Sequence, residues 1–141
     1  MPEESATPDL VELTRQLIDA GNRRDLDAAM SLLAPHVVWE SLDGLGVFDG
    51  ATAVHGFLED WLSSYEVFEM QPEVVRDIGN GIIFAAGRQV GRPLGATGRV
   101  EAPSAWAMTW EQELAVRIIA GIHIDEVRAA ADCVGCEMRA P

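Results

Sequence analysis

The sequence has few basic residues and no long apolar run, and each shortage excludes a class of function. Ten Lys and Arg stand against 23 Asp and Glu, which gives a formal charge of −13 at pH 7. Without a basic face to neutralise phosphates, nucleic acid and anionic membranes are not expected as partners. No apolar run approaches the roughly 20 residues that cross a bilayer. Residues 1–10 also lack the basic start and apolar stretch of a signal peptide. The chain is therefore predicted to be soluble and cytoplasmic.

Cysteine is also scarce. Cys133 and Cys136 are the two cysteines, and they form a CVGC motif near the C-terminus. A structural zinc site needs four ligands, and no second pair exists. A thioredoxin-like pair begins a helix after a strand, whereas this motif lies near the end of the chain. Both cysteines are interpreted as incidental, and neither a metal nor an organic cofactor is expected.

What the chain does have is the length and apolar content of one compact domain. Its 141 residues are 48% hydrophobic, and 13 glycines are spread along them. This is enough to bury a core but short for two separately folded units. We expect a disordered tail over residues 1–7, one domain over 8–132 and a C-terminal tail over 133–141.

Helical periodicity dominates the first half of the domain. Apolar residues recur at the spacing of about 3.6 residues that marks one helix face, which predicts helices over residues 8–22, 25–34 and 50–65. Pro35 is expected to stop the second helix, because proline lacks a backbone N–H. Asp49 is expected to cap the third.

In the second half of the domain, the hydrophobic pattern changes to the two-residue period of a strand. HVVWES, residues 36–41, is already a predicted strand by its β-branched and aromatic content, and the glycine-rich segment 42–50 is predicted to be a loop. Four further strands are predicted over residues 67–78, 81–91, 104–112 and 113–124. A short helix capped by Asp125 follows over 125–132. Helices followed by a meander of strands predict an α+β domain with a bent antiparallel sheet.

This order of elements resembles the cone-shaped fold of the nuclear-transport-factor-2-like (NTF2-like) superfamily, and within it the SnoaL-like (polyketide cyclase-like) group. The likeness rests on three segments, NRRDLDAAMSLLAPHVVWES, FDGATAVHGFL and IIAGIHIDEVRAAA, in a match over residues 8–132. It implies a curved antiparallel sheet wrapped around N-terminal helices, with an internal cavity. Members include isomerases, epoxide hydrolases, polyketide cyclases, dehydratases and non-catalytic domains, so activity depends on the cavity residues.

The catalytic groups of these relatives are missing at the matching positions. Where a ketosteroid isomerase has a carboxylate base, a tyrosine and a protonated aspartate, this chain has Ser41, Leu17 and Ala105. Where a limonene-epoxide hydrolase has its Arg-x-Asp and a second Asp, it has Gly87, Gln89 and Ile122. A SnoaL-type cyclase uses an aspartate deep in the cavity, but the carboxylates between residues 104 and 124 lie in the turn at 111–113.

The resemblance places a mainly apolar set with a few hydrogen-bonding groups around the cavity. Such a pocket suits a hydrophobic small molecule. The predicted pocket residues are Leu13, Leu17, Met30, Trp39, Ser41, Phe57, Trp61, Gly87, Gln89, Ala105, Ala107 and Ile122.

Three ionisable residues remain as catalytic candidates. Arg88 either faces the cavity, where it anchors a carboxylate or enolate-like oxygen, or pairs with Glu101 on the outer face. His123 has the same ambiguity. Glu40 alternates with Trp39, so it points outward if Trp39 points inward.

Along the segment 104–112, large side chains alternate with small ones, so one face of the strand carries a bulky stripe. If the small side lines the cavity, Trp106, Met108 and Trp110 lie on the outside of the sheet. Exposed tryptophans at that density mark an interface, and the resemblance implies a homodimer through the sheet. The alternative is that the bulky stripe forms the inner core.

Two functions stay open. The first is a cofactor-independent isomerase, cyclase or hydrolase that acts on a hydrophobic, carbonyl- or ring-bearing small molecule. The second is a non-catalytic small-molecule-binding or dimerisation domain of the same fold. An ionisable side chain inside the pocket favours the enzyme, whereas a wall of apolar side chains with Ser41 and Gln89 alone excludes acid–base catalysis.

Overall fold

The computed structural model describes residues 9–139, with side chains as far as Val134. Its elements are α1 (Leu10–Asn22), α2 (Leu26–Met30), β1 (Leu33–Ser41), β2 (Gly46–Asp49), α3 (Ala51–Ser63), β3 (Tyr65–Asp77), β4 (Ile82–Pro93), β5 (Val100–Glu111), β6 (Leu114–Gly121) and α4 (Ile124–Arg139). The α+β class predicted from the sequence is confirmed. Within these residues, no helix has the length and apolar character that a membrane span requires.

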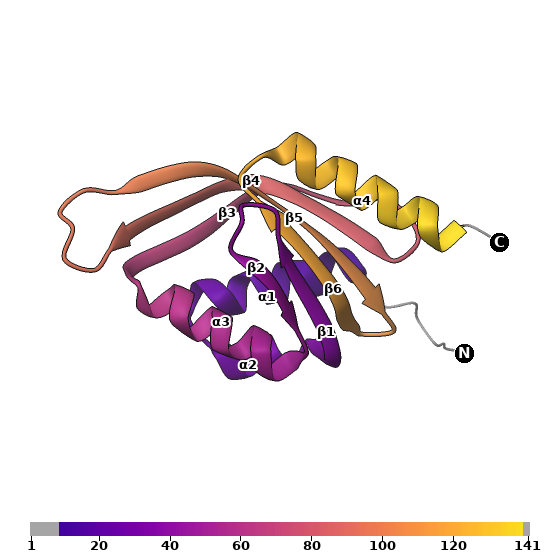
Figure 1. Ribbon diagram of the computed structural model, residues 1–141, viewed down its shortest axis with the longest axis horizontal. Coiled ribbons are helices and arrows are strands. Elements are labelled where there is room, and N and C mark those ends of the chain that lie inside the picture. Colours follow the sequence, from indigo (N-terminus) through magenta and orange to yellow (C-terminus); the bar gives the residue numbers. More distant parts are fainter. Residues whose placement is uncertain (1–8, 140–141) are drawn as a thin grey trace.

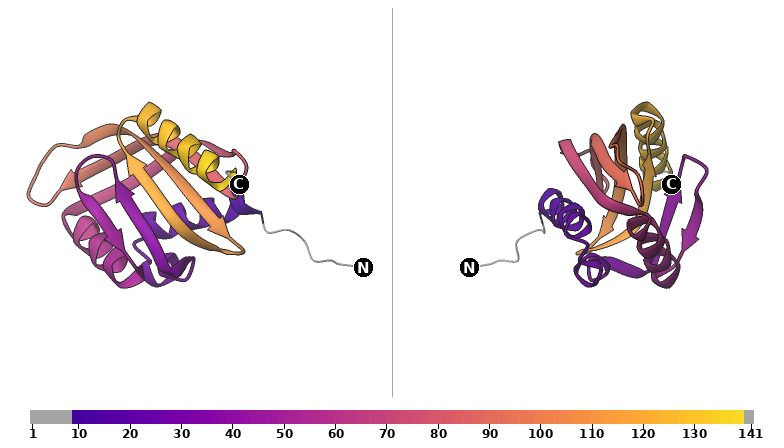
Figure 2. Two further views of the ribbon diagram at one scale, coloured as in Figure 1. Left: turned by 45° about the vertical axis from the view of Figure 1, so that its right-hand side comes forward. Right: turned by 90° about the vertical axis from the view of Figure 1, so that its left-hand side faces the viewer.

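All the described strands belong to one curved sheet in the order β2-β1-β6-β5-β4-β3. Neighbours are antiparallel except for β1 and β6, which run parallel. Figures 1 and 2 show α1, α2 and α3 on one side of the sheet and α4 on the other. We call the side toward α1–α3 the inner face and the side toward α4 the outer face.

Side-chain caps start the first two helices but not α3. Asp9 accepts the N–H of Glu12 at 3.1 Å, and Asp25 accepts that of Ala28 at 3.1 Å, so both satisfy a donor that the helix leaves unpaired. The cap predicted at Asp49 is wrong, because Asp49 ends β2 and the glycine after it precedes α3 with no side-chain cap. The cap predicted at Asp125 is also wrong, because α4 has already begun at Ile124.

Two further expectations about the segment 33–50 are wrong. Pro35 does not stop a helix, because α2 ends at Met30 and β1 begins at Leu33. The pairing of β1 with β6 shifts register between Leu33 and Val38, and this irregularity accommodates a residue without a backbone N–H. The predicted loop over 42–50 contains the edge strand β2, whose short, glycine-flanked sequence has little strand character.

The last helix is twice as long as predicted. It runs from Ile124 to Arg139 rather than over 125–132, so the boundary proposed at residue 132 falls inside it. Cys133 therefore lies in a helix, with an exposed thiol. The side chain of Cys136 and the tail predicted over 1–7 lie outside the described residues.

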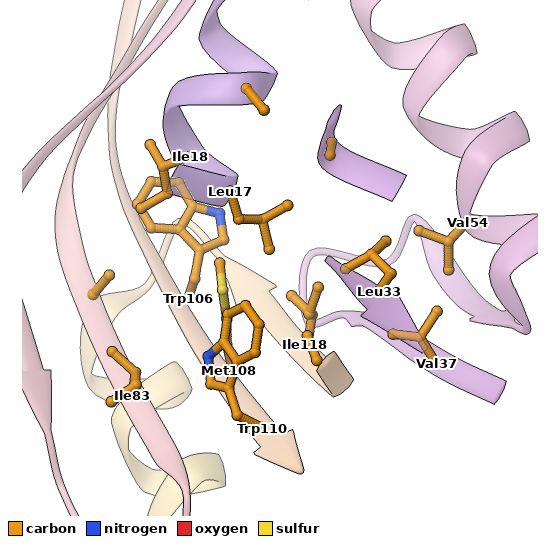
Figure 3. Packing of buried hydrophobic residues seen from close by; sticks show 14 residues of the cluster. Leu17, Ile18, Leu33, Val37, Val54, Ile83, Trp106, Met108, Trp110 and Ile118 are labelled. Atoms are coloured by element: carbon orange, nitrogen blue, oxygen red, sulfur yellow. The ribbon is translucent and has the colours of Figure 1, made fainter. Parts of the chain in front are cut away.

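The bulky stripe of β5 is part of the core. Trp106, Met108 and Trp110 are only 3–4% exposed and pack against α1 residues such as Leu17 and Ile18 on the inner face (Figure 3). Their predicted position at a dimer interface is therefore wrong, and the alternative of an inner core is correct. The homodimer itself stays a prediction.

A second cluster forms on the outer face. The small residues Ala105 and Ala107 of β5 pack there with Val127 and Ala131 of α4. Because these alanines have almost no side chain, the helix can approach the strand closely. α4 thus covers the part of the sheet that the tryptophans were predicted to expose.

One buried hydrogen bond joins α1 to the stripe. Thr14 is fully buried; its Oγ1 donates to the carbonyl of Leu10 at 2.8 Å and accepts from Nε1 of Trp110 at 3.0 Å. The threonine therefore satisfies an indole N–H that has no access to water. This contact fixes the start of α1 over the end of β5.

We predict that Thr14→Val lowers the free energy of unfolding by about 1–3 kcal/mol, because a shape-matched side chain leaves the Trp110 donor buried and unpaired. Chemical denaturation followed by tryptophan fluorescence measures the change. Thr52→Val, at an exposed helical position in α3, serves as the control and should change stability little. Equal stability of the two variants would contradict the role given to this hydrogen bond.

Candidate functional site

A pocket of about 120 Å³ lies between the inner face of the sheet and α1–α3. Its lining is mostly apolar and comes from the helices, from five strands and from the turn between β1 and β2. The residues are Leu17, Ile18, Gly21, Leu26, Ala29, Trp39, Ser41, Asp43, Leu45, Phe57, Leu58, Trp61, Leu62, Phe68, Met70, Gln89, Ser104, Trp106, Met108, Ala120, Gly121 and Ile122.

Aromatic rings follow one wall of the pocket. The ring of Phe57 lies 5.6 Å from that of Trp39 and 6.2 Å from that of Trp61, measured between centroids. Trp61 in turn meets Phe68 edge to face at 5.8 Å. These tilted and edge-on arrangements are the favourable ones for aromatic pairs. Residues of β1, α3 and β3 thus form a continuous apolar surface.

The structure brings seven of the twelve predicted pocket residues into this lining: Leu17, Trp39, Ser41, Phe57, Trp61, Gln89 and Ile122. Leu13 and Met30 pack instead against the core cluster on the inner face. That the seven residues contact a ligand stays a prediction.

Two of the misplaced residues, Ala105 and Ala107, lie on the opposite face of β5. Successive side chains of a strand point to opposite sides, so an error of one residue reverses every assignment. The pocket face of this strand carries Ser104, Trp106 and Met108. Ser104 was therefore missed, although the sequence contains the signal, since it lies two residues before Trp106.

The catalytic candidates Arg88 and Glu40 lie away from the pocket. Arg88 is exposed and forms an ion pair with Glu101, as the outer-face alternative predicts. Glu40 forms an ion pair with Arg117 of β6 at 3.3 Å. Both carry their charge on the outer face, where water solvates it.

His123 is exposed and lies between β6 and α4. Its backbone carbonyl accepts two N–H groups of the first helical turn, at 3.0 and 3.1 Å. The residue helps to start α4, and its position just past the pocket residue Ile122 does not bring it into the lining.

Asp43, in the turn between β1 and β2, is the one ionisable residue among the described residues of the pocket lining. Its Oδ1 accepts the backbone N–H of Ile122 at 3.2 Å, and its own N–H donates to Oγ of Ser41 at 3.3 Å. The side chain is exposed at the edge of the pocket. Sequence reasoning missed this role because it depends on the parallel pairing of β1 with β6, two strands far apart in the chain.

A model of the SnoaL-like domain family matches residues 14–118. The chain belongs to this family. Among curated proteins, none matches it.

Solved structures share the SnoaL-like architecture at low identity. An NTF2-like protein of unknown function from Burkholderia pseudomallei is similar with a TM-score of 0.73 and 21% identity, over 84% of this chain and 94% of that one. TerC, co-crystallized with polyporic acid, has a TM-score of 0.72 and 16% identity, over 87% and 98%. A putative SnoaL-like polyketide cyclase from Shewanella denitrificans has a TM-score of 0.72 and 12% identity, over 90% and 98%. These likenesses show the fold.

Gly87, a further residue predicted to line the SnoaL-like pocket, is instead covered by β3. A Cβ atom there would lie 2.1 Å from the carbonyl oxygen of Gln71 and 2.9 Å from the backbone N of Glu73. The pairing of β3 with β4 shifts register at this point, between Pro72 and Val74. At this irregularity, backbone atoms of β3 occupy the space that a side chain at position 87 would need.

We predict that Gly87→Ala destabilises the protein by about 3 kcal/mol, because backbone atoms cannot move aside as a flexible side chain can. Gly21→Ala is the control, since a Cβ there has no neighbour within 4 Å. Thermal unfolding of both variants measures the difference. A Gly87→Ala variant as stable as the parent protein would contradict the close approach of β3.

Proposed function

We propose that this SnoaL-like chain binds a neutral, hydrophobic, ring-bearing small molecule in the pocket. The observation that carries the proposal is the aromatic wall formed by Trp39, Phe57, Trp61 and Phe68. Rings of this kind offer large flat contacts to another ring. Sites for small molecules have the same character, with an apolar lining and a few placed polar groups.

The volume of the pocket supports a small ligand. At about 120 Å³, it is close to the engineered cavity of about 150 Å³ that admits benzene. Burial of one aromatic ring contributes about 1.5–3 kcal/mol. A single unsubstituted ring is therefore expected to bind weakly, with a Kd on the order of 10 mM.

The charge of the protein argues against an anionic ligand. Its formal net charge is −13, and within the described chain no Lys, Arg or His lines the pocket. An anion entering this apolar space would lose its hydration without gaining a cationic partner. TerC, which has the same fold, was co-crystallized with polyporic acid, which supports the use of such a fold for ligand binding.

Asp43 favours a second function, proton abstraction next to a carbonyl group. Its carboxylate lines the pocket beside Ser41, and a carboxylate within reach of a substrate C–H is the group such a reaction needs. One oxygen already accepts the Ile122 N–H at 3.2 Å. The same contact holds the β1–β2 turn to the end of β6, so Asp43 also has a structural role.

We predict that Gly21→Leu abolishes the binding of toluene, because the leucine fills the pocket. A Cβ at position 21 meets no atom within 4 Å, so a side chain can begin there without a clash, and leucine favours a helix more than glycine does. Saturation-transfer NMR with toluene measures binding. Gly56→Leu, at another open helical position outside the lining, is the matched control and should bind as the parent does. If Gly21→Leu binds toluene as the parent protein does, the toluene ring lies outside this pocket.

For the second function, we predict that the parent protein accelerates deuterium exchange at the α-carbons of 2-indanone in D₂O and that Asp43→Asn slows it by about 100-fold. The amide oxygen of asparagine still accepts the Ile122 N–H, so toluene binding should persist. ¹H NMR follows both. Exchange no faster than in buffer would refute catalysis and leave the binding function intact.

A further inference from the structure

Two buried polar groups in the pocket wall have no partner in the described part of the chain. Ser104 and Trp106 are each 3% exposed and line the pocket from β5. Neither Oγ of Ser104 nor Nε1 of Trp106 forms a hydrogen bond within residues 9–134, whereas Nε1 of Trp110 donates to Thr14 at 3.0 Å. Buried donors are nearly always paired. Two unpaired donors in a pocket therefore indicate that a bound molecule supplies the acceptor.

The two donors share one face of the sheet. They are two residues apart on β5, which places their Cα atoms about 7 Å from each other. Figure 3 shows the indole nitrogen of Trp106 turned toward Leu17, which also lines the pocket. Gln89 of β4 lies on the same face, because Gly87 pairs with Ser104 and Gln89 pairs with Ala102. Ser104, Trp106 and Gln89 are thus the polar residues that β4 and β5 contribute to the pocket lining, and we call them the polar patch.

The chemistry of the patch selects its acceptor. An indole N–H can only donate, and a serine hydroxyl donates readily. No cationic side chain lines the pocket within the described residues, so an anionic acceptor would be desolvated without a counter-charge. A neutral carbonyl oxygen needs only donors.

We infer that the ligand is a ring-bearing carbonyl compound whose oxygen accepts hydrogen bonds from Trp106 Nε1 and Ser104 Oγ while its ring packs on the aromatic wall. This inference rests on the proposed binding function and adds the two donor groups that orient the ligand. The competing occupant of the patch is an ordered water molecule, which can also satisfy buried donors.

The test compares acetophenone with α-methylstyrene, which have nearly the same shape and differ by an oxygen in place of a CH₂ group. NMR titration gives both affinities, and the indole N–H signals report the donor directly. We expect acetophenone to bind about fivefold more tightly. It should also shift the Trp106 indole proton downfield, an effect that α-methylstyrene lacks. Trp106→Phe assigns that signal.

Two variants test whether the preference for acetophenone depends on the polar patch. Ser104→Ala should reduce the preference for acetophenone while α-methylstyrene binds as before. Thr109→Val is the matched control and should keep the preference, because Thr109 is a buried hydroxyl residue on the opposite face of the same strand.

The outcomes distinguish the two proposals. Equal affinity for the two compounds with an unmoved Trp106 signal would overturn the carbonyl inference, assign the patch to water and leave the binding function standing. Absence of binding by both compounds, together with absence of toluene binding, would overturn the proposed function and the inference with it.

Discussion

The packing of the bulky face of β5 against the helices is the constraint on which the rest of the structure depends. Trp106, Met108 and Trp110 fill the space beneath α1, and the Thr14–Trp110 hydrogen bond fixes the helix above the strand. The pocket lies beside this stripe. Ser104 of β5 and the aromatic residues of α3 line it.

The small face of β5 has an equally definite consequence. Because Ala105 and Ala107 present little volume, α4 packs directly on the outer face through Val127 and Ala131. The helix buries apolar surface that an open sheet would leave exposed. A homodimer through the sheet stays a prediction, and it requires a surface other than the tryptophan stripe.

Much of the fold could be predicted from the sequence, and the failures have identifiable causes. The long helices and strands have strong periodicity, so their existence and order were predictable. The segment SAWAMTW is different, because both of its faces are uncharged and the hydrophobic pattern alone does not say which side is buried deeper. Strand β2 was missed because its sequence is short and contains glycine at its start.

The site was predictable where a residue's place depends on one helix or one strand. Trp39, Ser41 and Gln89 were placed in the pocket by the family resemblance, and the structure has all three in the lining. Asp43 was not, because its place depends on β1 pairing in parallel with β6, and no local pattern encodes a partner some 80 residues away along the chain. Long-range pairing is the information that a single sequence does not carry.

The distribution of charge explains why no described strand residue of the pocket lining is charged. Arg88, Glu40 and Arg117 lie on strands that line the pocket, yet their positions alternate to the outer face, where each has an ion-pair partner. Charges on that face keep their hydration, whereas the same groups turned inward would be desolvated among aromatic rings. Strand alternation therefore separates a charged exterior from an apolar interior on the same few strands. Within that interior, Ser104 and Trp106 are the uncharged donors that we propose orient a ligand.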